Sequence, residues 1–228
     1  MAGFLVTSLQ KRAASALILG PLALAIVYYG GLPFLFLLLA LALICLYEWV
    51  HVSLQAPRRV TSIVFGVLYI LISFWCCYLI RSAHPFALSL LFMSMIWASD
   101  IGAYLVGKTV RGPKMASKIS PNKTWSGFAG ALLSPAILSV VLLNGYFLFF
   151  EGGHLPDLSL DLFIFAAGFV VGFVGQAGDL MVSFLKRSAN VKDTGRIIPG
   201  HGGLLDRMDS MLLAAPVFLF IISMLANV

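Results

Sequence analysis

Long apolar runs recur along the whole chain, and they constrain its fold more than any other feature. Each is long enough to cross roughly 30 Å of hydrocarbon as a helix. The runs lie at about 13–29, 32–50, 61–80, 86–106, 126–149, 162–184 and 206–226. The sequence therefore predicts an all-α, polytopic transmembrane bundle of about seven spans. We expect one integral membrane domain over 1–228, with N-terminal helices in 1–96 and the chemistry-bearing helices and loops in 97–228.

Composition supports the same fold class. Hydrophobic residues make up 61% of the chain and charged residues 11%, with a mean hydropathy of +1.00, far from an ordinary soluble domain. The first run follows Lys11 and Arg12 as a secretory signal does, but it leads directly into another apolar run without a clear cleavage site. We expect a retained helix. The three cysteines lie inside apolar stretches without ligand-like spacing, which argues against disulfides and zinc.

Positive charge alternates sharply between successive connections. Of the 15 Lys and Arg residues, 14 fall before the first run or in the connections after the second, fourth and sixth runs, and only Arg81 falls on the opposite side. The positive-inside rule then predicts a cytoplasmic N-terminus, cytoplasmic basic loops and an external C-terminus. We expect the bilayer, rather than nucleic acid, to be the partner of this basic face. Topology alone is an equally good account of Arg58 and Arg59.

Small residues line one face of the sixth run. Gly168, Gly172, Gly175 and Gly178 recur at helical spacing, which is typical of membrane helices that pack closely. A phosphate-binding loop is the weaker interpretation, because no Lys-Ser/Thr ending follows these glycines.

Four carboxylates are predicted at the cytoplasmic side of the membrane. Asp100 and Asp179 stand inside apolar runs, where an ionised group is expensive and is a functional candidate by default. Asp206 and Asp209 are three residues apart at the start of the seventh run, so they share a helix face. Helix capping explains either of these two alone equally well. Together, Asp179, Asp206 and Asp209 offer the hard oxygen ligands that Mg²⁺ prefers.

Cations and hydrogen-bond donors surround these carboxylates in two loops. The stretch 183–209 carries Lys186, Arg187, Lys192, Arg196 and Arg207. The loop 108–125 is shaped by Gly112, Pro113 and Pro121, and it carries donors suited to phosphate oxygens, namely Lys118, Ser120, Asn122, Lys123 and Thr124. A merely solvated basic loop is the alternative. His201, between two glycines, either donates to a phosphate or shapes the turn.

The segment from Ser183 to Asp209 resembles the signature of the phosphatidate cytidylyltransferase (CDP-diacylglycerol synthase) family. Its SxxKRxxxxKDxGxxxPxHGGxxDRxD pattern is long and chemically mixed, so the match is specific. The resemblance extends upstream through 176–180, 120–125 and 97–104, and thus covers roughly 97–216. Farther upstream, only the segment 47–49 is similar. Val182 stands where the family often has an acidic residue, and the chain is shorter than many members.

The resemblance implies transfer of CMP from CTP to phosphatidate, giving CDP-diacylglycerol and pyrophosphate. It implies Mg²⁺ as cofactor, with K⁺ as a possible companion, held by Asp179, Asp206 and Asp209. The cations Lys186, Arg187, Lys192 and Arg207 would bind the phosphates. Asp100 would orient a cation or a metal-bound water. The remaining expected site residues are Ser183, Asp193 and His201 from the signature, and Lys118, Ser120, Asn122, Lys123 and Thr124 from the earlier loop.

Two other functions remain open at this point. A CTP-dependent lipid kinase would need a base for a hydroxyl nucleophile, and Asp100 or His201 could serve. An ion or phosphate transporter is the weaker alternative, because transporters usually place charges near the membrane midplane between internal repeats. Here the charges lie to one side, and the sequence shows no internal repeat. We expect a bacterial inner-membrane location, and a homodimer is compatible with the sequence.

Overall fold

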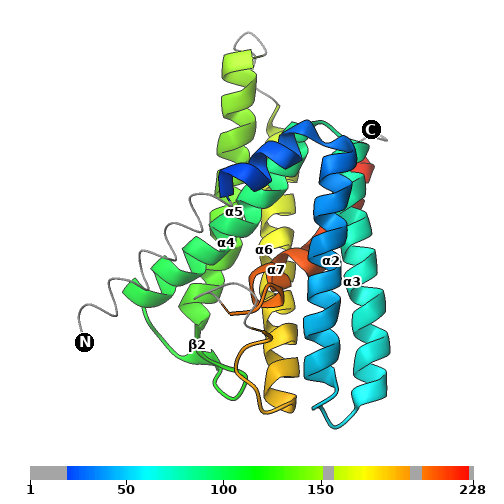
Figure 1. The fold of residues 1–228 in the computed structure, drawn as a ribbon. Helices are drawn as coiled ribbons and strands as arrows, with labels where there is room; N and C mark the ends of the chain where they lie inside the picture. The colour runs from blue at the N-terminus through cyan, green and yellow to red at the C-terminus, as the bar shows by residue number, and fades with distance from the viewer. Residues whose placement is uncertain (1–19, 151–156, 196–201, 226–228) are drawn as a thin grey trace, which may run out of the picture. The chain divides into compact units, whose positions relative to one another are not determined.

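The computed structural model describes residues 20–150, 157–195 and 202–225. Six helices in these ranges are long and apolar enough to cross a membrane, and a shorter apolar helix spans Gly20–Tyr29 (Figure 1). The six are α2 Gly31–Ser53, α3 Arg59–Ser82, α4 Phe86–Thr109, α5 Trp125–Phe150, α6 Leu158–Ser188 and α7 Leu205–Leu225. The predicted polytopic helical bundle is confirmed, and the protein is an integral membrane protein. The first predicted run lies partly outside the described residues.

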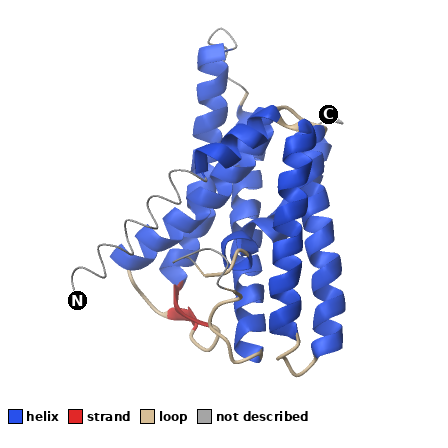
Figure 2. Cartoon of the chain, viewed as in Figure 1, coloured by secondary structure: helices blue, strands red, loops and turns tan. Residues whose placement is uncertain are grey.

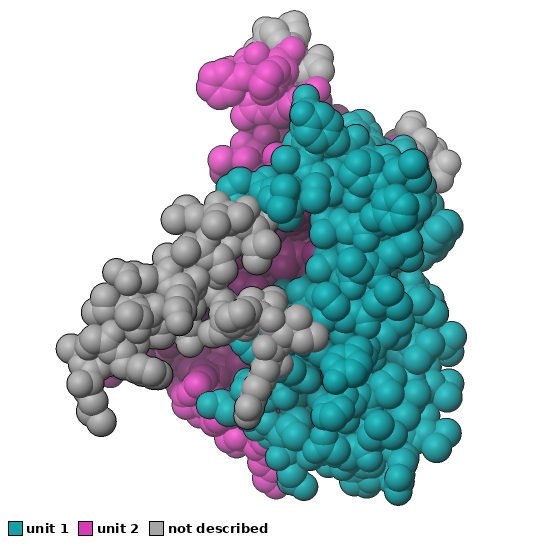
Figure 3. All heavy atoms as spheres, viewed as in Figure 1, with its two compact units in different colours: residues 1–86, 184–208 teal, residues 87–183, 209–228 magenta. Residues whose placement is uncertain are grey.

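The chain divides into two compact units, coloured separately in Figure 3. The first unit contains 1–86 and 184–208, and the second contains 87–183 and 209–228. The helices α6 and α7 therefore each contribute residues to both units. The first unit is discontinuous, because it joins the N-terminal helices to a loop that lies more than one hundred residues later in the chain.

In the first unit, α2 packs along α3, and Arg81 holds the short helix that precedes α2. The Nε1 of Trp49 donates to the carbonyl of Ser62 at 2.9 Å, and Gly66 leaves the space that the Trp49 ring fills. Arg81 donates to the carbonyls of Val27 and Tyr28 at 2.5 and 2.7 Å. These carbonyls end the helix Gly20–Tyr29, so the guanidinium satisfies acceptors that the helix itself leaves open.

In the second unit, small residues bring helices into backbone contact as predicted. A Cβ added to Gly168 would lie 2.6 Å from the carbonyl of Pro135, and one added to Gly172 would lie 2.4 Å from that of Ala131. Both carbonyls belong to α5. Gly178 faces α7 in the same way, with the carbonyl of Asp209 at 2.5 Å. The predicted packing face on α6 is confirmed.

A short hairpin occupies the basic loop between α4 and α5 (Figure 2). Strand β1 Lys114–Ala116 pairs antiparallel with β2 Ser120–Thr124, which the sequence analysis did not predict. Thr124 ends β2 and caps α5, because its Oγ1 accepts from the amide of Gly127 at 3.1 Å. The hairpin thus fixes Lys123 and Thr124 immediately before the first turn of α5.

Candidate active site

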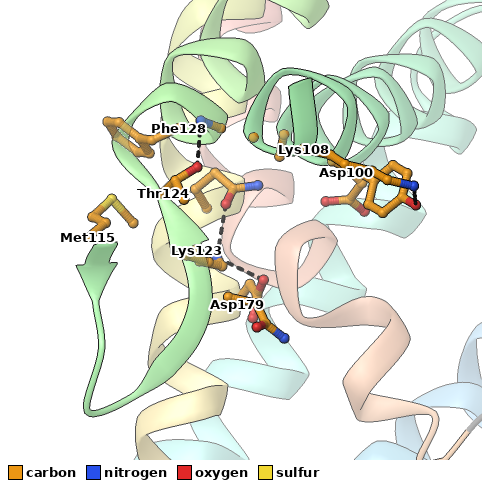
Figure 4. Close-up of a pocket in the computed structure, with 13 residues that line it drawn as sticks. Asp100, Lys108, Met115, Lys123, Thr124, Phe128 and Asp179 are labelled. Carbon is orange, nitrogen blue, oxygen red and sulfur yellow. Dashed lines mark hydrogen bonds and ion pairs between the residues drawn. The ribbon is translucent and has the colours of Figure 1, made fainter. Parts of the chain in front are cut away.

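A cavity of about 430 Å³ in the second unit collects several predicted site residues. Its walls come from α4, the hairpin, the start of α5 and α6, as Figure 4 shows. Predicted residues in its lining are Asp100, Asn122, Lys123, Thr124 and Asp179. We call it the Asp179 pocket. Its lining mixes carboxylates and ammonium groups, which suits a ligand that carries both phosphate and a cation.

The ion pair between Lys123 and Asp179 is the centre of the pocket. The Lys123 Nζ lies 2.8 Å from Asp179 Oδ2 and donates to Gln176 Oε1 at 2.9 Å (Figure 4). Ser183 Oγ donates to the other carboxylate oxygen, Oδ1, at 3.1 Å. The side chains of Lys123 and Asp179 remain 16% and 30% exposed, so both can reach a ligand that enters the pocket.

Three polar lining residues, Tyr104, Lys108 and Gln176, were not predicted. Gln176 is buried and orients the Lys123 ammonium, while Lys108 donates to the hydroxyl of Tyr104 at 3.1 Å. Gln176 and Tyr104 both lie in segments that carried the family resemblance, which was the available signal. Two predicted residues of the hairpin, Lys118 and Ser120, do not line this pocket.

A second group of polar residues lies in the first unit around Asp206. We call it the Asp206 cluster; its members are Glu48, Lys186, Thr194, Gly203 and Asp206. Lys186 Nζ lies 2.5 Å from Asp206 Oδ1. The other oxygen, Oδ2, accepts from the amide of Thr194 at 2.9 Å, from the Thr194 hydroxyl at 3.0 Å and from the amide of Gly203 at 3.3 Å. None of these amides belongs to α7, so hydrogen bonds to the free amides of that helix do not explain Asp206.

The cap of α7 comes instead from Glu48, a residue that the sequence analysis did not select. Its carboxylate accepts from the amides of Leu204 and Leu205 at 3.0 and 2.9 Å, and from the Thr194 hydroxyl at 2.9 Å. The side chain is fully buried. An ionisable group inside an apolar run was the signal that could have identified it, as it did for Asp100 and Asp179.

The remaining signature residues have different surroundings. Lys192 and Asp193 are exposed and line a cavity of about 610 Å³ in the first unit, together with Tyr47 and His51. Arg187 donates to the carbonyl of Val191 at 3.3 Å. Arg207 is exposed. His201 and Arg196 lie outside the described residues, so their predicted roles stay predictions.

The donor chemistry of the carboxylates fits Mg²⁺. Asp209 is buried, and its Oδ1 accepts from the amide of Ser210 at 2.8 Å. Asp179 keeps lone pairs beyond those used by Lys123 and Ser183, whereas on Asp206 only Oδ1, which accepts from Lys186, keeps one. Within the described ranges, no three His, Cys, Asp or Glu side chains gather as a metal-binding group. The three-carboxylate site therefore stays a prediction.

Comparison with known proteins decides the family. The profile of the cytidylyltransferase family matches residues 50–225, which is most of the chain and contains all the predicted site residues. The chain belongs to the cytidylyltransferase family. The matched residues include both the Lys123–Asp179 pair and the Lys186–Asp206 pair.

Individual cytidylyltransferases are similar over nearly the whole chain. A phosphatidate cytidylyltransferase of Rickettsia felis is 35% identical over 218 residues, which cover 94% of this chain and 92% of that protein. One of Rickettsia bellii is 32% identical, with 94% and 91% covered. One of Brucella suis is 30% identical over 257 residues, with 92% of each chain covered.

Proposed function

We propose that the protein is a phosphatidate cytidylyltransferase, which makes CDP-diacylglycerol and pyrophosphate from CTP and phosphatidate. The observation that carries this is an ion pair of a lysine and an aspartate in each compact unit, inside the residues that the family profile matches: Lys123 with Asp179, and Lys186 with Asp206. The names of the bacterial relatives support the substrates. Family membership makes a nucleotidyltransferase the appropriate class of enzyme.

The reaction is a displacement at phosphorus. An oxygen of the lipid phosphate attacks the α-phosphorus of CTP, the bond from that phosphorus to the oxygen bridging the β-phosphate breaks, and pyrophosphate leaves. The nucleophile is already ionised, so no side chain has to remove a proton. Both substrates are anionic, and their repulsion is a large part of the barrier. Catalysis then rests mainly on positioning and on stabilisation of negative charge.

The lysines of the two ion pairs are suited to that task. Each ammonium is already oriented by a carboxylate, and a phosphate oxygen offers the same charge-assisted hydrogen bond. Lys123 is held by Gln176 as well, so it can turn its remaining N–H toward a ligand in the Asp179 pocket. We assign Lys123 and Lys186 to phosphate binding, with Lys192, Arg187 and Arg207 as further cations.

The carboxylates of Asp179, Asp206 and Asp209 would be the ligands of Mg²⁺. The bound ion would neutralise phosphate charge, as Mg²⁺ does when it joins carboxylates to substrate phosphates. Asp100, in the lining of the Asp179 pocket, would orient a water or cation there. Potassium as a companion ion, and a homodimer, stay predictions.

The proposed location is the bacterial inner membrane, with the basic loops in the cytoplasm. The one-sided distribution of Lys and Arg supports this orientation, and CTP is available on that side. Labelling of single cysteines placed at Arg58 and at Asp157 with a membrane-impermeant reagent in intact cells tests it. Labelling at 157 and not at 58 is expected, and the reverse pattern would invert the topology.

The activity is tested with detergent-purified protein, phosphatidate, Mg²⁺ and CTP labelled at the α-phosphate. Label in the lipid fraction, dependent on Mg²⁺ and lost in Asp209→Ala, is the expected result. Asp157→Asn serves as the matched control, because it removes a carboxylate that lies outside both site regions. Transfer of label from γ-labelled CTP instead would identify a lipid kinase and overturn the proposal.

A further inference from the structure

Glu48 is a buried carboxylate to which the proposed reaction gives no role. It lies on α2, it is fully buried, and it precedes the residues 50–225 that the family profile matches. A buried ionisable group is costly unless hydrogen bonds compensate it. Its three partners are Thr194, Leu204 and Leu205, at 2.9 to 3.0 Å. All three lie in the segment that leads from Lys192 to Asp206.

The start of α7 depends on Glu48 because its own sequence supplies no cap. Leu204 stands immediately before the helix, where Ser, Thr, Asp or Asn normally accepts from the free amides. Glu48 provides that acceptor from another helix, and its negative charge also suits the positive end of the helix dipole. The first turn of α7, which carries Asp206, is therefore positioned by α2.

Thr194 connects Glu48 directly to Asp206. Its Oγ1 lies 2.9 Å from Glu48 Oε2 and 3.0 Å from Asp206 Oδ2, and its amide also donates to Asp206. The hydroxyl has a single hydrogen, so it donates to one carboxylate at a time while remaining between both. The place of the Asp206 carboxylate therefore depends on Thr194, and the place of Thr194 depends on Glu48.

Two glycines permit this close approach. A Cβ on Gly195 would lie 2.4 Å from Glu48 Oε1, and one on Gly203 would lie 2.0 Å from Thr194 Oγ1 and 2.6 Å from Glu48 Oε2. Any larger residue at either position would push the carboxylate away from the loop. The tight fit indicates that the Glu48 contact is specific to this loop conformation.

We propose that Glu48 is a positioning residue that fixes the Asp206 carboxylate, through Thr194 and the first turn of α7, in the orientation that the reaction requires. The inference rests on the proposed function, in which Asp206 is a Mg²⁺ ligand. Substitution of a residue that only stabilised the fold would lower the melting temperature and leave the Mg²⁺ dependence unchanged. Substitution of a positioning residue also changes the Mg²⁺ dependence, since loss of partners that orient a ligand typically lowers metal affinity or activity by about 10- to 100-fold.

The experiment compares Glu48→Gln, Thr194→Val and Thr194→Ser with the wild-type protein. The matched control is Ser53→Ala, which removes another fully buried polar group of α2, one that bonds Ser62 of α3 and not the loop. Two quantities are measured: the Mg²⁺ concentration for half-maximal cytidylyl transfer, and the Mg²⁺ midpoint of the thermal shift in detergent without substrate.

We expect Glu48→Gln and Thr194→Val to raise both Mg²⁺ midpoints about 10-fold or more. Thr194→Ser keeps the hydroxyl and should stay within about twofold of wild type, as should Ser53→Ala. Unchanged midpoints in Glu48→Gln and Thr194→Val would overturn the inference, even if both proteins melt earlier. If Glu48→Gln fails to fold, the Thr194→Val and Thr194→Ser pair decides.

The two readouts also separate this inference from the proposed function. A wild-type protein that binds Mg²⁺ but transfers no CMP would refute the proposed activity. The Mg²⁺ midpoints of the thermal shift in the variants would still test the role of Glu48. A wild-type protein with no Mg²⁺ midpoint in either assay would overturn the positioning role as stated.

Discussion

The Asp179 pocket and the Asp206 cluster hold the same kind of ion pair in very different surroundings. In the pocket, Asp179 is 30% exposed and accepts one further hydrogen bond, from Ser183. In the cluster, Asp206 is 12% exposed and accepts three further bonds. An aspartate with few protein donors can change its partner when a ligand arrives. An aspartate with many donors is fixed in advance. The Asp179 carboxylate is therefore suited to exchanging its partner for a ligand, whereas the Asp206 carboxylate is held in one orientation before a ligand binds.

Replacement of Asp206 by alanine should have the largest effect, on both activity and stability. The change leaves Lys186 and the donors of Thr194 and Gly203 without their common acceptor. We expect cytidylyl transfer to fall by about 10²- to 10³-fold, as for loss of a preorganised charged contact. The melting temperature should fall as well, because buried donors lose their partner. A variant with wild-type stability would show that the cluster is not preorganised.

Replacement of Asp179 by asparagine tests the more exposed of the two regions. Asparagine keeps the shape and one acceptor, so Ser183 retains its bond while Lys123 loses its ion pair. We expect activity to fall by about 10- to 100-fold, the range for a lost charge-assisted hydrogen bond. The melting temperature should stay close to wild type, since the pair is partly exposed. A large loss of stability would remove the distinction between the two regions.

A change in packing should affect stability more than chemistry. Gly172→Ala places a methyl group 2.4 Å from the carbonyl of Ala131, so α5 and α6 must separate. We expect a stability loss of about 1–3 kcal/mol, typical of overpacking. Gly145→Ala is the control, because nothing lies within 4 Å of a Cβ at that position. Equal melting temperatures for the two variants would contradict the close contact.

The smallest effect is expected at Asp157, which belongs to neither region. Its Oδ1 accepts from the amide of Leu160 at 3.0 Å and from the hydroxyl of Ser159 at 2.9 Å, and these bonds lower the pKa of the Asp157 carboxyl below its ordinary value. The stabilisation is therefore present above the ordinary pKa and is lost as the pH falls through the folded-state pKa. Asp157→Ala should melt slightly earlier at pH 7, match wild type under strongly acidic conditions and retain full activity. An equal difference in melting temperature at both pH values would contradict this.

Local patterns predicted the helices and selected several residues that the structure brings together in one pocket. Apolar length placed α2 to α7 to within a few residues, and Asp179 was selected because charge is expensive in such a run. Lys123 was selected from its loop as a phosphate donor, and the structure pairs it with Asp179. These features depend on composition over a short window, which a sequence displays directly.

The rest depends on contacts that no short window contains. The strands of the hairpin have only 3 and 5 residues, too few for an alternating pattern to stand out. Asp206 looked like a helix cap because it stands in a first turn, yet the cap comes from Glu48, 156 and 157 residues away from the amides that it accepts from. Only the tertiary fold shows which acceptor reaches those amides.

The long sequence separation between Glu48 and its partners determines when their contacts can form during synthesis of the chain. Ribosomes add about 5–20 residues per second, so roughly 7 to 30 s pass between the appearance of Glu48 and that of Thr194, 146 residues later. During this interval α2 enters the membrane with a carboxylate whose final partners do not yet exist. The group must remain hydrated or be held by the insertion machinery until α6 has been inserted. Assembly of the first unit is therefore a late event, which is complete only after the loop between α6 and α7 has been synthesised.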